Sequence, residues 1–212
     1  MTPDRAEASF WAAFIRNRNV DLGSADDGAV SVAGGYALYV AGTYHQIALG
    51  VGSTRPLRED DLEVLHAFYG ARRHPPRLEL RDDVLERDRA VLEAAGYEAS
   101  DGKLGLYETT AVPEPNPKIT VRAVNDRAGW VKLVTRAFAQ GHEPDDESRR
   151  SATISAAAAH GLFIAEVDGV PAGAGAVAIT ADVAYLYSGA VLPHFRCRGV
   201  HRALLHARAK FG

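Results

Sequence analysis

The chain has 212 residues, of which 47% are hydrophobic and 24% are charged, a composition typical of a folded globular protein. A formal net charge of -3 argues against a nucleic-acid-binding protein, because such proteins carry a basic face. The longest apolar stretches, such as 169–179, are too short to cross a bilayer, and the single cysteine, Cys197, excludes an intramolecular disulfide. We therefore expect a cytoplasmic protein with no membrane partner, no nucleic-acid partner and no metal.

The first half of the chain has the pattern of a small α+β domain. Aromatic and aliphatic residues at 10–15 share one face of a predicted helix, and residues 29–51 alternate as in β structure. In chain order, the pattern then predicts a helix at 57–69, a short strand at 77–80, a helix at 84–95 that ends at Gly96, and a closing strand at 104–109. This half contains no concentrated chemical motif.

A proline-rich segment at 113–117 separates the two halves. Pro113, Pro115 and Pro117 remove backbone donors and favour extended structure, so we expect a linker between domains there. The sequence thus predicts a first domain at 1–112 and a second domain at 118–212.

The second half has a clearer pattern, in the order β-α-α-β-β-β-α. A strand at 119–124 leads to Asn125, a predicted N-cap, and to a helix whose apolar residues recur at helical spacing up to Phe138. Pro144 suits the first position of a second helix, which ends near 160. A strand at 162–167, a hairpin turn at Asp168-Gly169, strands at 171–180 and 183–192, and a helix at 199–210 complete the order.

The turn between the last strand and the last helix carries the strongest chemical signal. It contains Arg196, Arg198 and Gly199, and Arg202 follows in the helix. Backbone N–H groups at a helix start have no intrahelical partner, and together with the helix dipole they attract anions. Gly199 leaves space for a diphosphate near the backbone, and the arginines add charge. The pattern predicts a phosphate-ester site without a metal. The alternative is a solvated turn with incidental arginines, whereas a P-loop is disfavoured because Gly-Lys-Ser/Thr is absent.

This turn resembles the pyrophosphate-binding turn of the GCN5-related N-acetyltransferases, whose pattern is Gln/Arg-x-x-Gly-x-Gly/Ala. Residues 196–201 match the first two fixed positions, and His201 stands where the family prefers glycine or alanine. The Asp168-Gly169 hairpin and the strand-helix opening at 119–138 are also similar to the family. The resemblance covers 118–212. It implies an α/β (α+β) fold, with a mixed, mostly antiparallel sheet flanked by helices.

The resemblance implies direct transfer of an acetyl group from acetyl-coenzyme A, as co-substrate, to a primary amine of a small molecule or peptide. The strand at 183–192 should separate from the next strand of the family fold near Gly189–Val191. Its backbone would then pair with the pantetheine arm, and one N–H would polarise the thioester carbonyl. The residues implied to bind the cofactor are Ala190, Val191, Leu192, Arg196, Cys197, Arg198, Gly199, Val200, His201 and Arg202.

No motif marks the groups that would transfer protons. Glu166, towards the end of a central strand, is a candidate general base, and it equally fits a surface carboxylate at a hairpin end. Tyr187, a second catalytic candidate, shares its side-chain direction with Tyr185, so both face the acceptor channel or fill the core. His142 and Glu143 are candidate substrate-binding residues or, alternatively, solvated loop residues.

Two features of the chain as a whole complete these expectations. The first half is faintly similar to the closing part of the same fold, so we expect a degenerate copy that binds no coenzyme A; an unrelated α+β cap is the alternative. The family fold continues after the helix at 199–210 with a further strand. We therefore expect either a truncated chain or a partner that completes the sheet, for example a homodimer through the sheet edge. A non-catalytic coenzyme A-binding or regulatory module is the alternative to an N-acetyltransferase.

Overall fold

The structure is a computed structural model that describes residues 3–17, 26–100, 116–180 and 183–211. The chain divides into two compact units, Met1–Tyr107 and Glu108–Gly212. The predicted strand at 104–109 and most of the predicted linker at 113–117 lie outside the described residues. Within the described part of the chain, every helix is too short or too polar to span a membrane.

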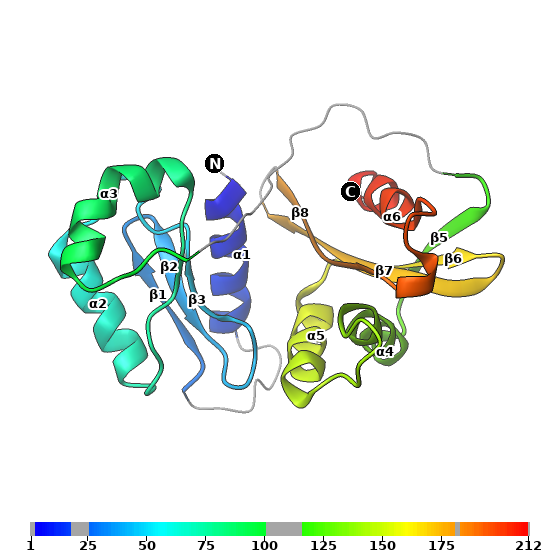
Figure 1. Ribbon diagram of the computed structural model, residues 1–212, viewed down its shortest axis with the longest axis horizontal. Coiled ribbons are helices and arrows are strands. Elements are labelled where there is room, and N and C mark those ends of the chain that lie inside the picture. The colour runs from blue at the N-terminus through cyan, green and yellow to red at the C-terminus, as the bar shows by residue number, and fades with distance from the viewer. Residues whose placement is uncertain (1–2, 18–25, 101–115, 181–182, 212) are drawn as a thin grey trace. The chain divides into compact units, whose positions relative to one another are not determined.

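The first unit is a four-stranded sheet with helices on both faces (Figure 1). α1 (Pro3–Asn17) covers one face, and α2 (Glu59–Gly70) and α3 (Asp82–Ala94) lie on the other. The strands run in the order β1 (Gly28–Val32), β2 (Gly35–Tyr39), β3 (Gln46–Leu49) and β4 (Leu78–Glu79). The first three pair antiparallel, and β4 pairs parallel with β3.

The core of the first unit follows the predicted helix faces. Trp11 and Ile15 of α1 are 3% and 2% exposed, which places the aromatic face of this helix against the sheet. From the other side, Leu65 and Tyr69 of α2 are fully buried. Burial of such side chains on both faces of the sheet is the main driving force for folding of this unit.

The second unit has the predicted order of elements. It consists of β5 (Ile119–Val124), α4 (Arg127–Phe138), α5 (Asp146–Ala158), β6 (Gly161–Val167), β7 (Val170–Thr180), β8 (Val183–Val191), the 3-10 turn η1 (Pro193–Phe195) and α6 (Val200–Ala209). The strands form an antiparallel sheet in the order β5-β6-β7-β8. α6 covers one face, and α4 and α5 cover the other (Figure 1). The predicted mixed fold of sheet and flanking helices is confirmed.

Two predicted helix starts are wrong by a residue or two. Asp126, and not Asn125, caps α4, because its carboxylate accepts the Gly129 N–H at 2.9 Å. Asp145 caps α5 by accepting the Ser148 N–H at 2.7 Å, so Pro144 precedes the helix instead of starting it. In both helices an aspartate is the N-cap, and its negative charge also interacts favourably with the helix dipole.

A β-bulge interrupts the pairing of β7 with β8. Ala174 pairs with Ala190, but Ala176 pairs with Tyr187, so the register shifts between them. Ser188 and Gly189 therefore stand opposite the single residue Gly175, and Ser188 has a left-handed φ of 49°. An extra residue of this kind bends the strand and exposes backbone groups. The bulge lies directly before the end of β8, where the arginine-containing turn begins, and so it shapes the edge of the strand there.

Candidate functional site

The turn between β8 and α6 contains two residues in the left-handed region. Cys197 has φ 59° and Gly199, the N-cap of α6, has φ 89°. A side chain at such a φ is strained, so glycine is favoured at position 199 by its backbone conformation. A Cβ at Gly199 would meet only Ile119 Cδ1, at 3.8 Å, so the space around this backbone is open. The turn therefore combines a tight path with an accessible backbone.

A run of unpaired backbone N–H groups follows from this path. The Phe195 and Arg196 N–H groups close η1 by donating to Leu192 O at 2.9 Å and Pro193 O at 3.2 Å. The first bond within α6 is from the Ala203 N–H to Gly199 O, at 3.0 Å. Between them, no N–H group from Cys197 to Arg202 has a partner among the described residues. Such a run at a helix start is an anion-binding site.

The charged side chains of the turn reinforce this site. Arg196 donates to Val191 O at 3.3 Å and to Ala137 O at 3.4 Å, so it ties the turn to β8 and to α4. The Arg198 guanidinium lies 5.5 Å from the centre of the Phe195 ring. The first turn of α6 holds no acidic residue, whereas it does hold Arg202. The local field thus favours a negatively charged ligand.

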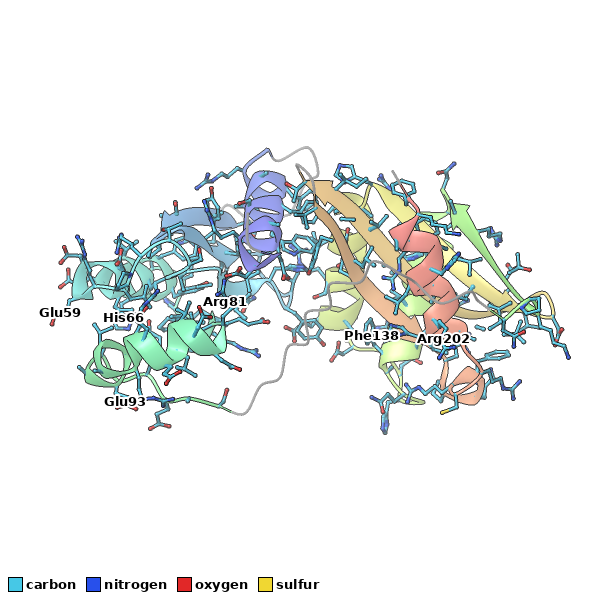
Figure 2. The ribbon with its side chains drawn as sticks, turned by 90° about the horizontal axis from the view of Figure 1, so that it is seen from above. Glu59, His66, Arg81, Glu93, Phe138 and Arg202 are labelled. Atoms are coloured by element: carbon cyan, nitrogen blue, oxygen red, sulfur yellow. The ribbon has the colours of Figure 1, made fainter. Side chains whose placement is uncertain are left out.

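A cavity of about 630 Å³ opens beside the turn. Figure 2 labels Phe138, at the end of α4, and Arg202, in the first turn of α6, which line it together. The lining comprises Ala137 and Phe138 from the end of α4, Gln140 just after that helix, residues 189–191 of β8, residues 195–197 and 199 of the turn, and residues 200–202 of α6. The volume lies in the range of small-molecule and cofactor sites.

Most of the residues predicted to bind the cofactor line this cavity, and two do not. Leu192 is buried at 7% exposure, and Arg198 lies outside the lining. The lining also includes residues that the sequence reasoning did not assign, Gly189 and Phe195 among them. A glycine inside a strand often marks a bulge, so Gly189 could have been recognised from the sequence as a candidate bulge residue.

The edge of β8 offers one further backbone donor. The Leu192 N–H donates to Ala172 O at 2.9 Å. Because pairing alternates along an antiparallel strand, the Val191 N–H and C=O point away from β7, towards the edge. No strand pairs with β8 on that side among the described residues. The Val191 N–H is therefore placed to bond an extended ligand lying in the cavity.

The two candidate catalytic residues are engaged elsewhere. The Glu166 carboxylate pairs with Arg122, with 3.1 Å between Oε1 and Nη2. The Tyr187 hydroxyl donates to Ser155 O at 3.0 Å, and burial raises the pKa of Tyr187 above its ordinary range. Its ring stacks on Tyr185 with 5.0 Å between centres, as expected from their shared direction. Neither Glu166 nor Tyr187 lines the cavity.

The predicted substrate-binding loop residues also lie outside the cavity lining. Glu143 pairs with Arg149 at 2.5 Å, and the His142 N–H donates to Ala139 O at 2.9 Å. Their neighbour Phe138 lines the cavity instead. Its helical spacing predicted a core position, which is wrong, because Phe138 is 56% exposed at the end of α4.

His201 occupies the irregular position of the motif and lines the cavity. A Cβ added to Gly189 would lie 3.3 Å from His201 Nε2, so this glycine leaves space for the ring. Burial, followed by the nearby charge of Arg208, lowers the pKa of His201. The described residues contain no group of three or more metal-ligating side chains.

The fold and the turn together define a mixed sheet-and-helix domain with an anion-binding helix start. Residues 128–212 match the model of the acetyltransferase (GNAT) family, and this part of the chain is a GNAT acetyltransferase domain. Among curated proteins, none matches the chain.

Two solved structures show how far the likeness extends. A GCN5-related N-acetyltransferase from Kribbella flavida shares 16% identity over 99% of this chain and 82% of its own, with a TM-score of 0.58. At this identity, the likeness establishes the fold. A presumed acetyltransferase from Pyrococcus horikoshii shares 15% identity over 49% of this chain, with a TM-score of 0.38. The matched part spans 38% of the Pyrococcus protein, and a TM-score this low supports no argument.

Proposed function

We propose that this protein transfers an acetyl group from acetyl-coenzyme A to a primary amine of a small molecule or peptide. The observation that carries the proposal is the run of unpaired N–H groups from Cys197 to Arg202, beside a cavity and among arginines. A pyrophosphate fits this arrangement, because it accepts several hydrogen bonds and carries negative charge. We place the protein in the cytoplasm.

The residues of the chain divide the binding work between two regions. Backbone N–H groups of the turn, with Arg196 and Arg202, would hold the pyrophosphate. The edge of β8 at Ala190 and Val191 would pair with the pantetheine arm, and the Val191 N–H would polarise the thioester carbonyl. The amine would attack that carbonyl, form the amide bond and release the coenzyme A thiol.

Glu166 and Tyr187 play no part in this proposal, because both are held by contacts outside the cavity. The same observation favours one alternative, a non-catalytic coenzyme A-binding or regulatory module. Such a module would use the turn in the same way and would lack a positioned base.

We also propose that the first unit is a degenerate copy of the same fold. It repeats the succession of a helix, three consecutive antiparallel strands and a helix. The start of its α2 carries Glu59, Asp60 and Asp61, so we expect it to bind no coenzyme A.

Titration calorimetry with acetyl-coenzyme A, followed by an assay of thiol release with a panel of amines, tests the proposal. We expect binding of one ligand per chain and amine-dependent thiol release. Binding without thiol release would favour the regulatory module, and the absence of binding would contradict both functions.

A further inference from the structure

Arg208, near the end of α6, is a buried cation beneath the β7–β8 ladder. Its exposed fraction is 1%, and it forms no ion pair among the described residues. Its Nη1 donates to Tyr187 O at 3.1 Å and to Ala176 O at 3.3 Å, and its Nε donates to Leu204 O at 3.1 Å. Burial lowers the pKa of Arg208 to about 10, so the group is still charged at neutral pH.

The guanidinium is fitted to the bulge of β8. Ala176 and Tyr187, whose carbonyls it binds, form the last regular pair before the bulge. A Cβ on Gly175 would lie 2.8 Å from Arg208 Cζ, and a Cβ on Gly189 would lie 3.0 Å from Nη2. A Cβ at Gly175 would therefore displace the guanidinium, and a Cβ at Gly189 would crowd it.

The first unit shows what the same position looks like without a bulge. There, β2 pairs with β3 in continuous register from Tyr36–Leu49 to Tyr39–Gln46. The helix that follows, α2, sends a neutral group to the sheet: the Tyr69 hydroxyl donates to Leu38 O at 3.2 Å. In this chain, the buried cation and the bulge occur together in the second unit.

One side of the guanidinium has no hydrogen-bond partner. Nη2 makes no bond among the described residues, and it lies towards Gly189, where the lining of the cavity begins. The charged or titratable residues that line the cavity are Arg196, Cys197, His201 and Arg202, and the lining includes no aspartate or glutamate. An uncompensated positive charge in a site of low polarity stabilises negative charge that develops nearby.

We propose that Arg208 is a positioning residue for acyl transfer, which holds the bulge of β8 and sets a positive charge beneath Gly189. Its electrostatic role rests on the proposed function. When the amine nitrogen bonds to the thioester carbon, the carbonyl oxygen becomes negative. The carbonyl then re-forms as the C–S bond breaks, its electron pair passes to sulfur, and the proton lost by the amine ends on the released coenzyme A thiol. Arg208 lowers the energy of both anionic stages without touching the substrate.

Four variants separate this role from a structural one. Arg208→Met removes the charge and keeps much of the volume. Arg208→Lys keeps the charge. Gly175→Ala displaces the guanidinium but changes no cavity residue, and Lys210→Met removes an exposed cation from the same helix end as a control. Melting temperature, hydrogen exchange of the 186–192 amides, acetyl-coenzyme A affinity and the rate at saturation are measured for each.

We expect Arg208→Met and Gly175→Ala to speed amide exchange at 186–192 by about tenfold and to slow acetyl transfer at saturation by about 100-fold, as for loss of an oxyanion donor. Affinity for acetyl-coenzyme A should change little, Arg208→Lys should recover part of the rate, and Lys210→Met should match the unmodified protein. Unchanged amide exchange in both variants would contradict the claim that Arg208 holds the bulge of β8. Faster exchange with an unchanged rate would overturn the electrostatic role. An unmodified protein that transfers no acetyl group would contradict the proposed function. The exchange data would still show whether Arg208 holds the bulge of β8.

Discussion

The turns that lead into α2 and α6 follow three consecutive antiparallel strands, β1–β3 in the first unit and β6–β8 in the second. The two turns differ in the charged groups that lie at the helix start. At α2, the chain supplies its own anions. Asp61 accepts the Arg58 N–H at 2.9 Å and pairs with Arg55 at 2.6 Å. Asp88 accepts the Leu57 N–H at 3.2 Å. In the first unit, carboxylates of the chain itself thus accept hydrogen bonds from the N–H groups at the start of α2.

At α6, no carboxylate among the described residues accepts a hydrogen bond from the helix start. The N–H groups from Cys197 to Arg202 have no partner among the described residues, and the charged side chains around them are arginines. The comparison shows that a helix following three antiparallel strands does not by itself create an anion site. The residues that occupy or vacate the first turn of the helix decide whether one exists.

The largest expected effect comes from Gly199→Val, which forces a β-branched residue to φ 89°. Strain of about 1–3 kcal/mol would distort the turn or move it. We therefore expect acetyl-coenzyme A affinity to fall by about 10-fold or more in titration calorimetry.

Gly96→Val is the matched control for that experiment. Gly96 has φ 82° with open space around it, and it lies in the first unit. It should show a similar backbone strain and no loss of affinity. Equal affinity losses in the two variants, or none in either, would contradict the placement of the site.

Asp61→Ala should affect stability and leave binding unchanged. Loss of an N-terminal cap and of the Arg55 pair is expected to reduce the free energy of unfolding by about 1–2 kcal/mol, measured by urea denaturation of the first unit within the whole chain. Acetyl-coenzyme A affinity should stay at the value of the unmodified protein. A clear change in affinity would show that the α2 start takes part in ligand binding.

The pH dependence of this stabilisation has a defined sign. Hydrogen bonds, first from Arg55 and then from the Arg58 N–H, hold the pKa of Asp61 below its ordinary value. The contribution is therefore complete above the unfolded pKa of about 3.9 and is lost as the pH falls through the lower folded value. Asp61→Ala should flatten the acid limb of stability below about pH 4, and an unchanged acid limb would argue against this pair.

The smallest expected effect is that of Arg202→Gln. This exposed arginine should contribute about fivefold to acetyl-coenzyme A affinity, and less as salt screens the charge. Arg89→Gln, which removes an exposed arginine from α3 that pairs with Glu93 at 3.7 Å, is the control in the first unit. An Arg202→Gln affinity loss that is independent of salt would mean that the residue acts by packing instead of charge.

The sequence was sufficient for the order of elements, because apolar periodicity and turn residues act locally. The Asp168-Gly169 hairpin is an example: both residues have positive φ, 51° and 77°, as an Asp-Gly turn requires. The tight turn between β8 and α6 was also predictable, since its arginines and Gly199 are close together in the chain. The linker and domain boundaries, and the roles of individual site residues, stay predictions.

Positions that depend on contacts between distant segments could not be predicted in the same way. Phe138 is exposed at the last residue of α4, although it continues the apolar spacing of that helix. Glu166 meets Arg122 only through strand pairing. The burial of Arg208 could have been suspected from the sequence, because this residue lies four residues after Leu204 on the apolar face of α6. The glycines that receive its guanidinium are on other strands, and only the folded structure brings them to it.

Hydrogen exchange of the whole chain, with and without acetyl-coenzyme A, compares the two turns in one measurement. We expect the ligand to slow amide exchange at 197–202 and at Val191, and to leave the α2 start at 57–62 unchanged. Protection at 57–62 equal to that at 197–202, or no protection at 197–202 with saturating ligand, would contradict the claim that only the second unit holds the acetyl-coenzyme A site.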